Sequence, residues 1–399
     1  MRLKSVSFKI AILFLVFTAV FTLFRSSMSG IFSLFYAKNG IPDANISSIK
    51  SFQNIGIIFG LLPAGYLADR IGRLKVLALS SLVIATSFFI LILFRNFFFF
   101  STAELLYGIG LALNSGTLLA YVTDLQEQTN GDASNYFEFN HINRWKYWDW
   151  LFGIKDTAPI WFAMLGLALY PALIWFMISI LSFSDNRASN KKQVECSAKN
   201  IVSFFRKRNF WILLLLNVGY DCGTQFILIY WSIIYVEKLG FNLSLVYTLF
   251  MYALILGSVL FSKISTSVNS KNLTLLNTVC MIGAFVLSGT LENKYILFCL
   301  FLLIELLMGM MSGQISATSN EAIYGKSNKS TMLSTISFIA EILVSVSLFI
   351  SNSIMKVFEN LNVMFFVSAI YFGIVLLTIP LIKENKDVRQ NMAKNVSKS

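Results

Sequence analysis

Residues 65–75 read Gly65-Tyr66-Leu67-Ala68-Asp69-Arg70-Ile71-Gly72-Arg73-Leu74-Lys75 and join two long apolar runs, 44–69 and 74–94. The connection gathers glycine, one acid and several bases within a few residues. Gly72 permits a tight turn, and Gly65 lets the first run approach a neighbour closely. Asp69 and Arg73 are charges at the ends of apolar runs, where opposite charges and helix termini hold them. We therefore expect a charged turn between two helices.

The composition around this turn is that of a membrane protein. Of the 399 residues, 56% are hydrophobic and only 13% are charged, whereas about a quarter of the residues of a soluble domain are charged. Lipid is the solvent that suits so much apolar surface. The net charge of +12 would favour nucleic acid in a soluble protein. However, no basic helix is interleaved with aromatic residues, and we expect no nucleic-acid partner.

Residues that support enzyme chemistry are scarce. The chain has one histidine, His141, and four cysteines, three of which lie within apolar runs. The sequence contains no phosphate-binding loop, no metal-ligand spacing and no nucleophile–base pair. We therefore expect that the chain is not an enzyme and that it uses no cofactor or metal.

Twelve apolar runs are long enough to cross a bilayer as helices, which takes roughly 20 residues each. They lie near 8–36, 44–69, 74–94, 97–124, 142–164, 166–183, 209–236, 244–264, 272–290, 294–320, 330–356 and 361–382. With both termini in the cytoplasm, 24 of the 32 basic residues fall on the cytoplasmic side and five outside, while Arg25, Lys50 and Lys155 lie in or beside spans. This asymmetry follows the positive-inside rule and predicts a multi-pass protein of the cell (plasma) membrane.

A polar connector divides the chain into two groups of six spans. We expect an N-terminal six-helix bundle at 1–184, a basic cytoplasmic linker at 185–208, a C-terminal six-helix bundle at 209–383 and a cytoplasmic tail at 384–399. Residues 200–210 fit either a short amphipathic helix or a disordered tether. An internal repeat supports the division, because Glu104-Leu105-Leu106-Tyr107-Gly108 recurs as Glu305-Leu306-Leu307-Met308-Gly309 in the equivalent span.

Residues 65–75 resemble the signature loop of the major facilitator superfamily, G-x-L-x-D-R-x-G-R followed by basic residues; Leu74 stands where a base is common. The resemblance implies an all-α membrane protein with 12 transmembrane helices in two pseudo-symmetric six-helix bundles. It also implies a conformational latch that holds the halves together when the protein faces outward. Its residues would be Gly65, Asp69, Arg70, Gly72, Arg73 and, at the end of the fourth span, Asp124. A generic charged turn is the alternative.

Other segments are similar to the bacterial drug-efflux-like branch of this family. Gly108-Ile109-Gly110 with Ser115-Gly116 resembles its fourth helix, and residues 329–334 resemble the start of its eleventh. Two features depart from the pattern. Leu105 stands where proton-driven members often carry arginine, and only Ala158-Pro159 corresponds to the glycine-rich stretch of drug antiporters. These departures concern antiport and do not affect the fold.

Charges placed well inside the predicted spans are the candidate functional residues, because a charge at the bilayer centre costs at least about 2.5–3.5 kcal/mol and usually faces a cavity. We expect substrate binding or proton coupling from Arg25, Glu104, Lys155, Asp156, Asp221, Glu305 and Glu341. Structural bonding to neighbouring helices is the alternative for the three glutamates. Arg25 and Asp221 lie at similar depths in the two halves, which predicts that they pair across the cavity.

Together these features predict a secondary active transporter that works by alternating access. Acids outnumber bases among the intramembrane charges, which favours cations, so we expect proton-coupled efflux of a small amphipathic or cationic compound. Proton-coupled uptake of a nutrient such as a sugar is the alternative, and a non-transporting membrane sensor is a remote one. The expected partners are a small-molecule substrate, protons and the lipid bilayer, with the chain functional as a monomer.

Overall fold

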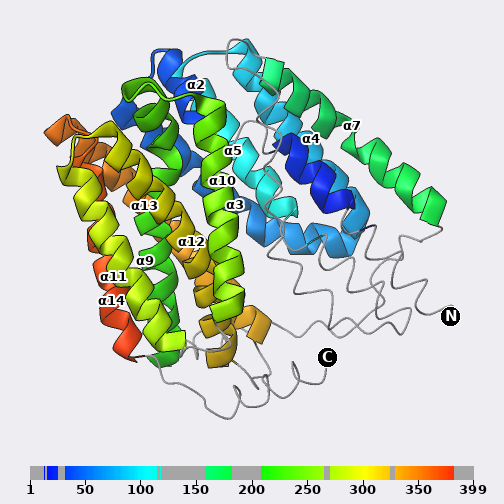
Figure 1. Cartoon of the computed structure of the whole chain (residues 1–399). Helices are drawn as coiled ribbons and strands as arrows, with labels where there is room; N and C mark the ends of the chain where they lie inside the picture. The colour runs from blue at the N-terminus through cyan, green and yellow to red at the C-terminus, as the bar shows by residue number, and fades with distance from the viewer. Residues whose placement is uncertain are drawn as a thin grey trace. The chain divides into compact units, whose positions relative to one another are not determined.

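The computed structural model describes residues 13, 16–25, 32–114, 117, 158–181, 208–264, 270–323 and 329–381. Within these ranges every regular element is a helix (Figure 1). The chain divides into two compact units, Met1–Gln193 and Val194–Ser399. The division falls inside the predicted linker 185–208.

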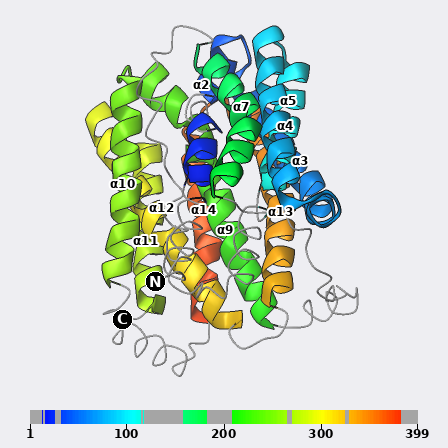
Figure 2. The same ribbon diagram turned by 90° about the vertical axis from the view of Figure 1, so that its right-hand side faces the viewer.

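The N-terminal unit is a bundle whose first described helix is the short apolar helix Val16–Arg25. Its other described helices are α2 (Phe32–Lys38), α3 (Asp43–Ile71), α4 (Arg73–Leu93), α5 (Phe97–Asn114) and α7 (Ala158–Leu181). Helix α5 packs against both α3 and α4, and α4 also packs against α7 (Figure 2).

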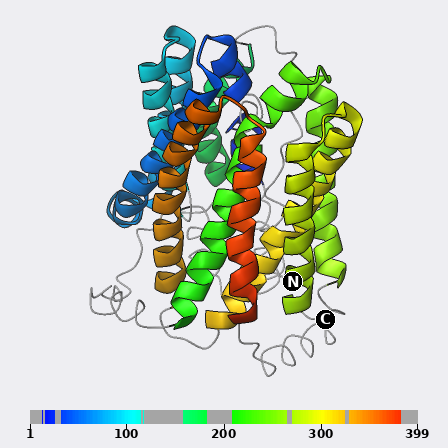
Figure 3. The same cartoon turned by 90° about the vertical axis from the view of Figure 1, so that its left-hand side faces the viewer.

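The C-terminal unit repeats this arrangement. Its described elements are α9 (Arg208–Trp231), the π-helix η3 (Ser232–Lys238), α10 (Leu243–Ile264), α11 (Ser270–Thr290), α12 (Lys294–Ile323), α13 (Lys329–Phe358), α14 (Val363–Thr378) and the 3-10 turn η4 (Ile379–Leu381). Helix α12 packs against α10 and α11, α11 packs against α14, and α9 packs against α13 and α14 (Figure 3). The packing of α12 on its two neighbours is therefore the counterpart of the packing of α5.

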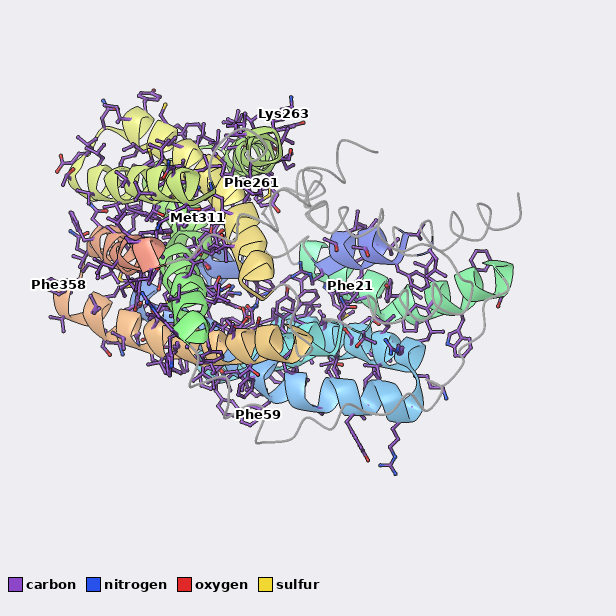
Figure 4. The ribbon with its side chains drawn as sticks, turned by 90° about the horizontal axis from the view of Figure 1, so that it is seen from below. Phe21, Phe59, Phe261, Lys263, Met311 and Phe358 are labelled. Atoms are coloured by element: carbon purple, nitrogen blue, oxygen red, sulfur yellow. The ribbon has the colours of Figure 1, made fainter. Side chains whose placement is uncertain are left out.

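The surface of both units suits lipid. Among the described residues, eight helices are long and apolar enough to cross a membrane, and Val16–Arg25 and Ile160–Phe176 are shorter apolar helices. Large apolar side chains also lie on the outside: Phe59 is 67% exposed and Phe358 is 59% exposed, whereas Met311 is fully buried (Figure 4). An apolar exterior of this kind is stable in a bilayer. The chain is a multi-pass membrane protein.

One predicted boundary is wrong. The break expected between the fifth and sixth spans, 142–164 and 166–183, lies inside the continuous helix α7. Gly166 packs there against the ring of Phe24, so the glycine serves helix packing rather than a turn. Because α7 packs on α4 as α14 packs on α11, α7 is the sixth span of its unit. Residues 142–157 of the predicted fifth span lie outside the described residues.

The internal repeat extends well beyond the two Glu-Leu-Leu motifs. Gly56 of α3 lies against the carbonyl oxygen of Leu105 in α5, and Gly257 of α10 lies against that of Leu306 in α12. Each residue of the second pair follows its counterpart by 201 positions. A Cβ on either glycine would collide with backbone, so both crossings are close enough to require glycine. The two units therefore share the register of this helix pair.

The turns that follow the first spans also correspond. Gly40 and Gly240 both have left-handed backbones, with φ of 82° and 73°. The N–H of the residue after each glycine donates to the carbonyl oxygen of Tyr36 or Tyr235, at 3.2 and 3.0 Å. One more residue separates tyrosine from glycine in the second unit. The π-helix η3 accommodates this residue, because a π-turn holds one residue more than an α-turn.

Candidate functional site

The charged turn of residues 65–75 is a one-residue link between two helices. Helix α3 ends at Ile71, α4 begins at Arg73, and Gly72 between them has φ 99° and ψ 144°. This backbone region is essentially restricted to glycine. The exposed Arg70 donates a hydrogen bond to the hydroxyl of Tyr66 (3.0 Å), and Arg73 is half-buried at the start of α4. The structure thus has the tight turn that the glycine predicted.

Of the other predicted latch residues, two lie in α3 and one lies outside the described residues. Gly65 and Asp69 belong to α3, in its last two turns. Asp124 lies outside the described residues. The contact between this acid and the charged turn therefore stays a prediction.

A buried ion pair lies near the start of α3 and α5. Glu104 of α5, 1% exposed, accepts hydrogen bonds on the same oxygen, Oε1, from the ammonium of Lys50 in α3 (2.5 Å) and from the hydroxyl of Tyr36 in α2 (2.6 Å). The lysine side chain is 13% exposed. The cluster therefore joins three elements of the N-terminal unit through one carboxylate.

Aromatic and amide groups surround the Lys50 ammonium. It lies 4.3 Å from the centroid of the Phe32 ring and 3.4 Å from the amide oxygen of Gln53. A cation over an aromatic face gains electrostatic attraction, and more so where water is excluded. The second oxygen of Glu104, Oε2, is buried and accepts no hydrogen bond from the described part of the chain.

Charges buried together depend strongly on one another. Removing one partner of a buried ion pair costs about 3–5 kcal/mol, because the other charge is left in a medium that solvates it poorly. Replacing both partners by uncharged groups is often nearly neutral. The Lys50–Glu104 pair is therefore expected to tolerate simultaneous neutralisation better than the loss of either charge.

Lys50 is the residue of this cluster that sequence reasoning missed. The sequence places Lys50 in or beside a span, and bonding of Glu104 to a neighbouring helix is an expected alternative, but no partner is named for this acid. The signal was present, because Lys50 is the only charged residue of the run 44–69 before Asp69. An isolated base in one span and an isolated acid in a neighbouring span are natural partners.

Arg25 lies in the same unit, at the end of the helix Val16–Arg25. Its guanidinium donates a hydrogen bond to the hydroxyl of Tyr107 (3.3 Å), one turn after Glu104 on α5. The Tyr107 ring packs edge-on against Phe32, at 5.6 Å between centroids, and against Phe88. Arg25 and Lys50 thus contribute two cations to a mainly aromatic region that contains the carboxylate of Glu104.

Two predicted acids come close together in the C-terminal unit. Asp221 of α9 and Glu341 of α13 lie on helices that pack against each other, within electrostatic reach of one another. Both residues are half-buried. Next to Asp221 on the same helix, Cys222 lies beside Ser347 of α13, and Ser347 hydrogen-bonds with the hydroxyl of Tyr371 at 2.6 Å. Two neighbouring carboxylates can hold a proton or a cation between helices.

Glu305 is the counterpart of Glu104 in the second unit. It is buried in α12 beside Tyr235 of η3. Tyr235 itself donates to the carbonyl oxygen of Leu297 (3.3 Å), whereas its counterpart Tyr36 donates to Glu104. The repeat therefore keeps the acid and the tyrosine but changes their bonding.

The placement of the remaining predicted site residues relative to these clusters stays a prediction. Lys155 and Asp156 lie outside the described residues. Arg25 and Asp221 belong to different units, and their pairing stays a prediction.

Two family models match the chain. The model described as "MFS/sugar transport protein" matches residues 151–364, and the model described as "Major Facilitator Superfamily" matches residues 13–131. No curated protein sequence matches it.

Solved structures of the same fold extend over nearly the whole chain. The nucleoside transporter NupG is 12% identical with a TM-score of 0.72, and the match covers 95% of this chain and 100% of NupG. A D-xylose-proton symporter is 14% identical with a TM-score of 0.65, covering 92% and 97%. A bacterial homologue of the human lysosomal transporter Spinster is 11% identical with a TM-score of 0.65, covering 95% and 96%.

The matched model that covers more than half of the chain, together with the repeated helix packing, defines the class of protein. The chain belongs to the major facilitator superfamily and has its fold. It is a membrane transporter and not an enzyme.

Proposed function

We propose that this transporter takes up a small polar solute of the sugar or nucleoside class together with protons, by alternating access. The observation that carries the proposal is the Lys50–Glu104 pair. The lysine offsets the glutamate, so the N-terminal unit is less acidic than the predicted charges alone suggested. A smaller excess of negative charge in this unit weakens the case for a cationic substrate and favours a neutral polar solute.

The names of similar proteins also support a sugar or nucleoside as the substrate. The longer family match is described as a sugar transport protein, and similar structures include a nucleoside transporter and a D-xylose-proton symporter. Sugars and nucleosides share several hydroxyl groups, which polar side chains bind selectively because a hydroxyl left unpaired is costly. Membership of the drug-efflux-like branch stays a prediction.

Efflux of a small amphipathic cation is the second candidate. It is favoured by Asp221 and Glu341, since two neighbouring carboxylates attract positive charge. The same two acids suit proton coupling in either direction, because a carboxylate can exchange a proton each time its access changes. We assign them, with Glu305, to substrate binding or proton coupling.

The latch and the topology complete the proposal. Gly65, Asp69, Arg70, Gly72, Arg73 and Asp124 would stabilise one orientation of the two units from the cytoplasmic side, with both termini in the cytoplasm of the cell that carries the protein in its plasma membrane. Because the family fold contains two complete bundles, a monomer is sufficient for transport.

The test is transport into proteoliposomes that contain the purified protein. Radiolabelled D-xylose and uridine would be supplied outside, with the lumen at higher pH than the bath, and accumulation compared with protein-free liposomes and with a protonophore. Accumulation that the protonophore abolishes is the expected result. If neither solute enters, while a fluorescent lipophilic cation exchanges for protons, the chain is an exporter and the uptake proposal is wrong.

A further inference from the structure

The lysine of the buried ion pair is a feature of one unit and not of the repeat. Glu104 and Tyr36 correspond to Glu305 and Tyr235, but the position equivalent to Lys50 is Met251, 201 residues later. At this position the first unit therefore has a base and the second unit has a methionine.

The element that this base helps to hold is α2. Its Tyr36 donates to Glu104 and its Phe32 lies under the Lys50 ammonium. The Tyr36 ring also packs on Phe100 of α5, with 4.8 Å between centroids. The ion pair is thus the polar centre of the docking site of α2.

We propose that Lys50 and Glu104 form an electroneutral anchor that keeps α2 docked on α3 and α5 during transport, so that Glu104 positions α2 and does not carry the coupled proton. A proton on Glu104 would leave the Lys50 ammonium beside a neutral group in a site with little water. It would also weaken the charge-assisted hydrogen bond from Tyr36.

The groups that face Glu104 support this assignment. Among the described residues, the charged or titratable ones are Lys50 from α3 and Tyr36 from α2. Tyr107 of α5 lies near Tyr36 and accepts a hydrogen bond from Arg25, and α4 contributes the apolar Phe88 to the same region. The ammonium at 2.5 Å is the dominant charge among them. The proton would instead be carried in the C-terminal unit or by residues outside this cluster. Only this last point rests on the proposed proton coupling; the anchor itself does not.

The anchor is tested with Lys50→Met, which copies the second unit, with Glu104→Gln and with the double variant. Lys38→Met on the exposed end of α2 is the matched control. In detergent, each single variant is expected to lower Tm by roughly 5–10 °C, and the double variant and the control to stay within a few degrees of wild type. If the Tm of the double variant is as low as that of the less stable single variant, the anchor proposal is wrong.

Docking of α2 is measured by cysteine labelling, separately from the global stability that Tm reports. In a background without native cysteines, Ala37→Cys on α2 would be labelled at low temperature by a membrane-impermeant maleimide. The labelling rate is expected to rise several-fold with Lys50→Met and with Glu104→Gln, and to rise less in the double variant, where no charge is left unpaired. An unchanged rate in the single variants would show that α2 does not depend on the pair.

Transport by the double variant tests the assignment of the proton. In the proteoliposome assay with D-xylose and uridine, the double variant is expected to keep both proton-driven accumulation and solute exchange. Exchange without accumulation would mean that Glu104 carries the proton, which overturns the proposal. If the wild type itself shows no proton-driven accumulation, the proposed coupling fails, while Tm and labelling still decide whether the anchor exists.

Discussion

Gly56 of α3 and Gly257 of α10 occupy the same place in the two units, each with its Cα against the carbonyl oxygen of a leucine on the neighbouring helix. The leucines, Leu105 and Leu306, follow the repeated glutamates directly. In a membrane there is little hydrophobic drive between helices, so close backbone approach supplies much of the packing energy. The two crossings are therefore the rigid centres of their units.

Replacing either glycine by alanine is expected to force these helices apart. Overpacking of this kind costs about 1–3 kcal/mol, and more where the clash is with backbone. Gly56→Ala and Gly257→Ala should each lower Tm and the yield of folded protein. Gly283→Ala on α11 is the control, because a Cβ there meets nothing within 4 Å. Equal Tm values for all three variants would contradict the close crossings.

The turn at Gly72 makes a second prediction. Its φ of 99° is strained for any residue with a Cβ, so Gly72→Ala should cost roughly 1–3 kcal/mol. Tm measures this cost. Gly373→Ala, a helical glycine with open space around it, should leave Tm unchanged. A Gly72 variant as stable as the Gly373 variant would mean that the link adopts another backbone conformation.

Tyr36 and Tyr235 occupy equivalent places in the two units, so the contributions of their hydrogen bonds to stability can be compared. The Tyr36 hydroxyl donates to a carboxylate, and such a bond contributes about 1.5–3 kcal/mol. The Tyr235 hydroxyl donates to a carbonyl oxygen, a bond of about 0.5–1.5 kcal/mol. Tyr36→Phe should therefore lower the unfolding temperature more than Tyr235→Phe. The opposite order would argue against the hydrogen bond to Glu104.

Asp221 and Glu341 are expected to act in coupling rather than in stability. Asp221→Asn and Glu341→Gln should abolish proton-driven accumulation in proteoliposomes while solute exchange persists, because the amides cannot exchange the proton. Glu237→Gln, at an exposed position of η3, should behave as wild type. If both amide variants still accumulate solute, the proton is carried elsewhere.

Topology can be checked with two cysteines at opposite ends of α3. The helix has 29 residues, a length of roughly 44 Å at 1.5 Å per residue, enough to cross a bilayer. Lys38→Cys, before α3, should be labelled by an impermeant maleimide in intact cells. Arg70→Cys, in its last turn, should be labelled only after permeabilisation. Labelling of both in intact cells would refute the proposed orientation.

Much of the fold could be predicted because it follows from local patterns. The apolar runs predicted α3, α4 and α10 to α14 to within a few residues, since lipid demands helices of this length and composition. The break expected between the spans 142–164 and 166–183 is wrong, because residues 158–181 contain no charged residue and continue as one helix. Nothing in the sequence between 160 and 181 separates a packing glycine from a turn glycine.

The sequence by itself determined that this chain spans a membrane in two related halves, because hydropathy, charge bias and the repeated Glu-Leu-Leu motif are properties of neighbouring residues. Only the tertiary structure decided that Glu104 is paired with Lys50, 54 residues away, and that Gly56 and Gly257 hold equivalent crossings. Contacts of this kind depend on which faces of two helices meet. That choice is made by packing over the whole unit and leaves no local pattern.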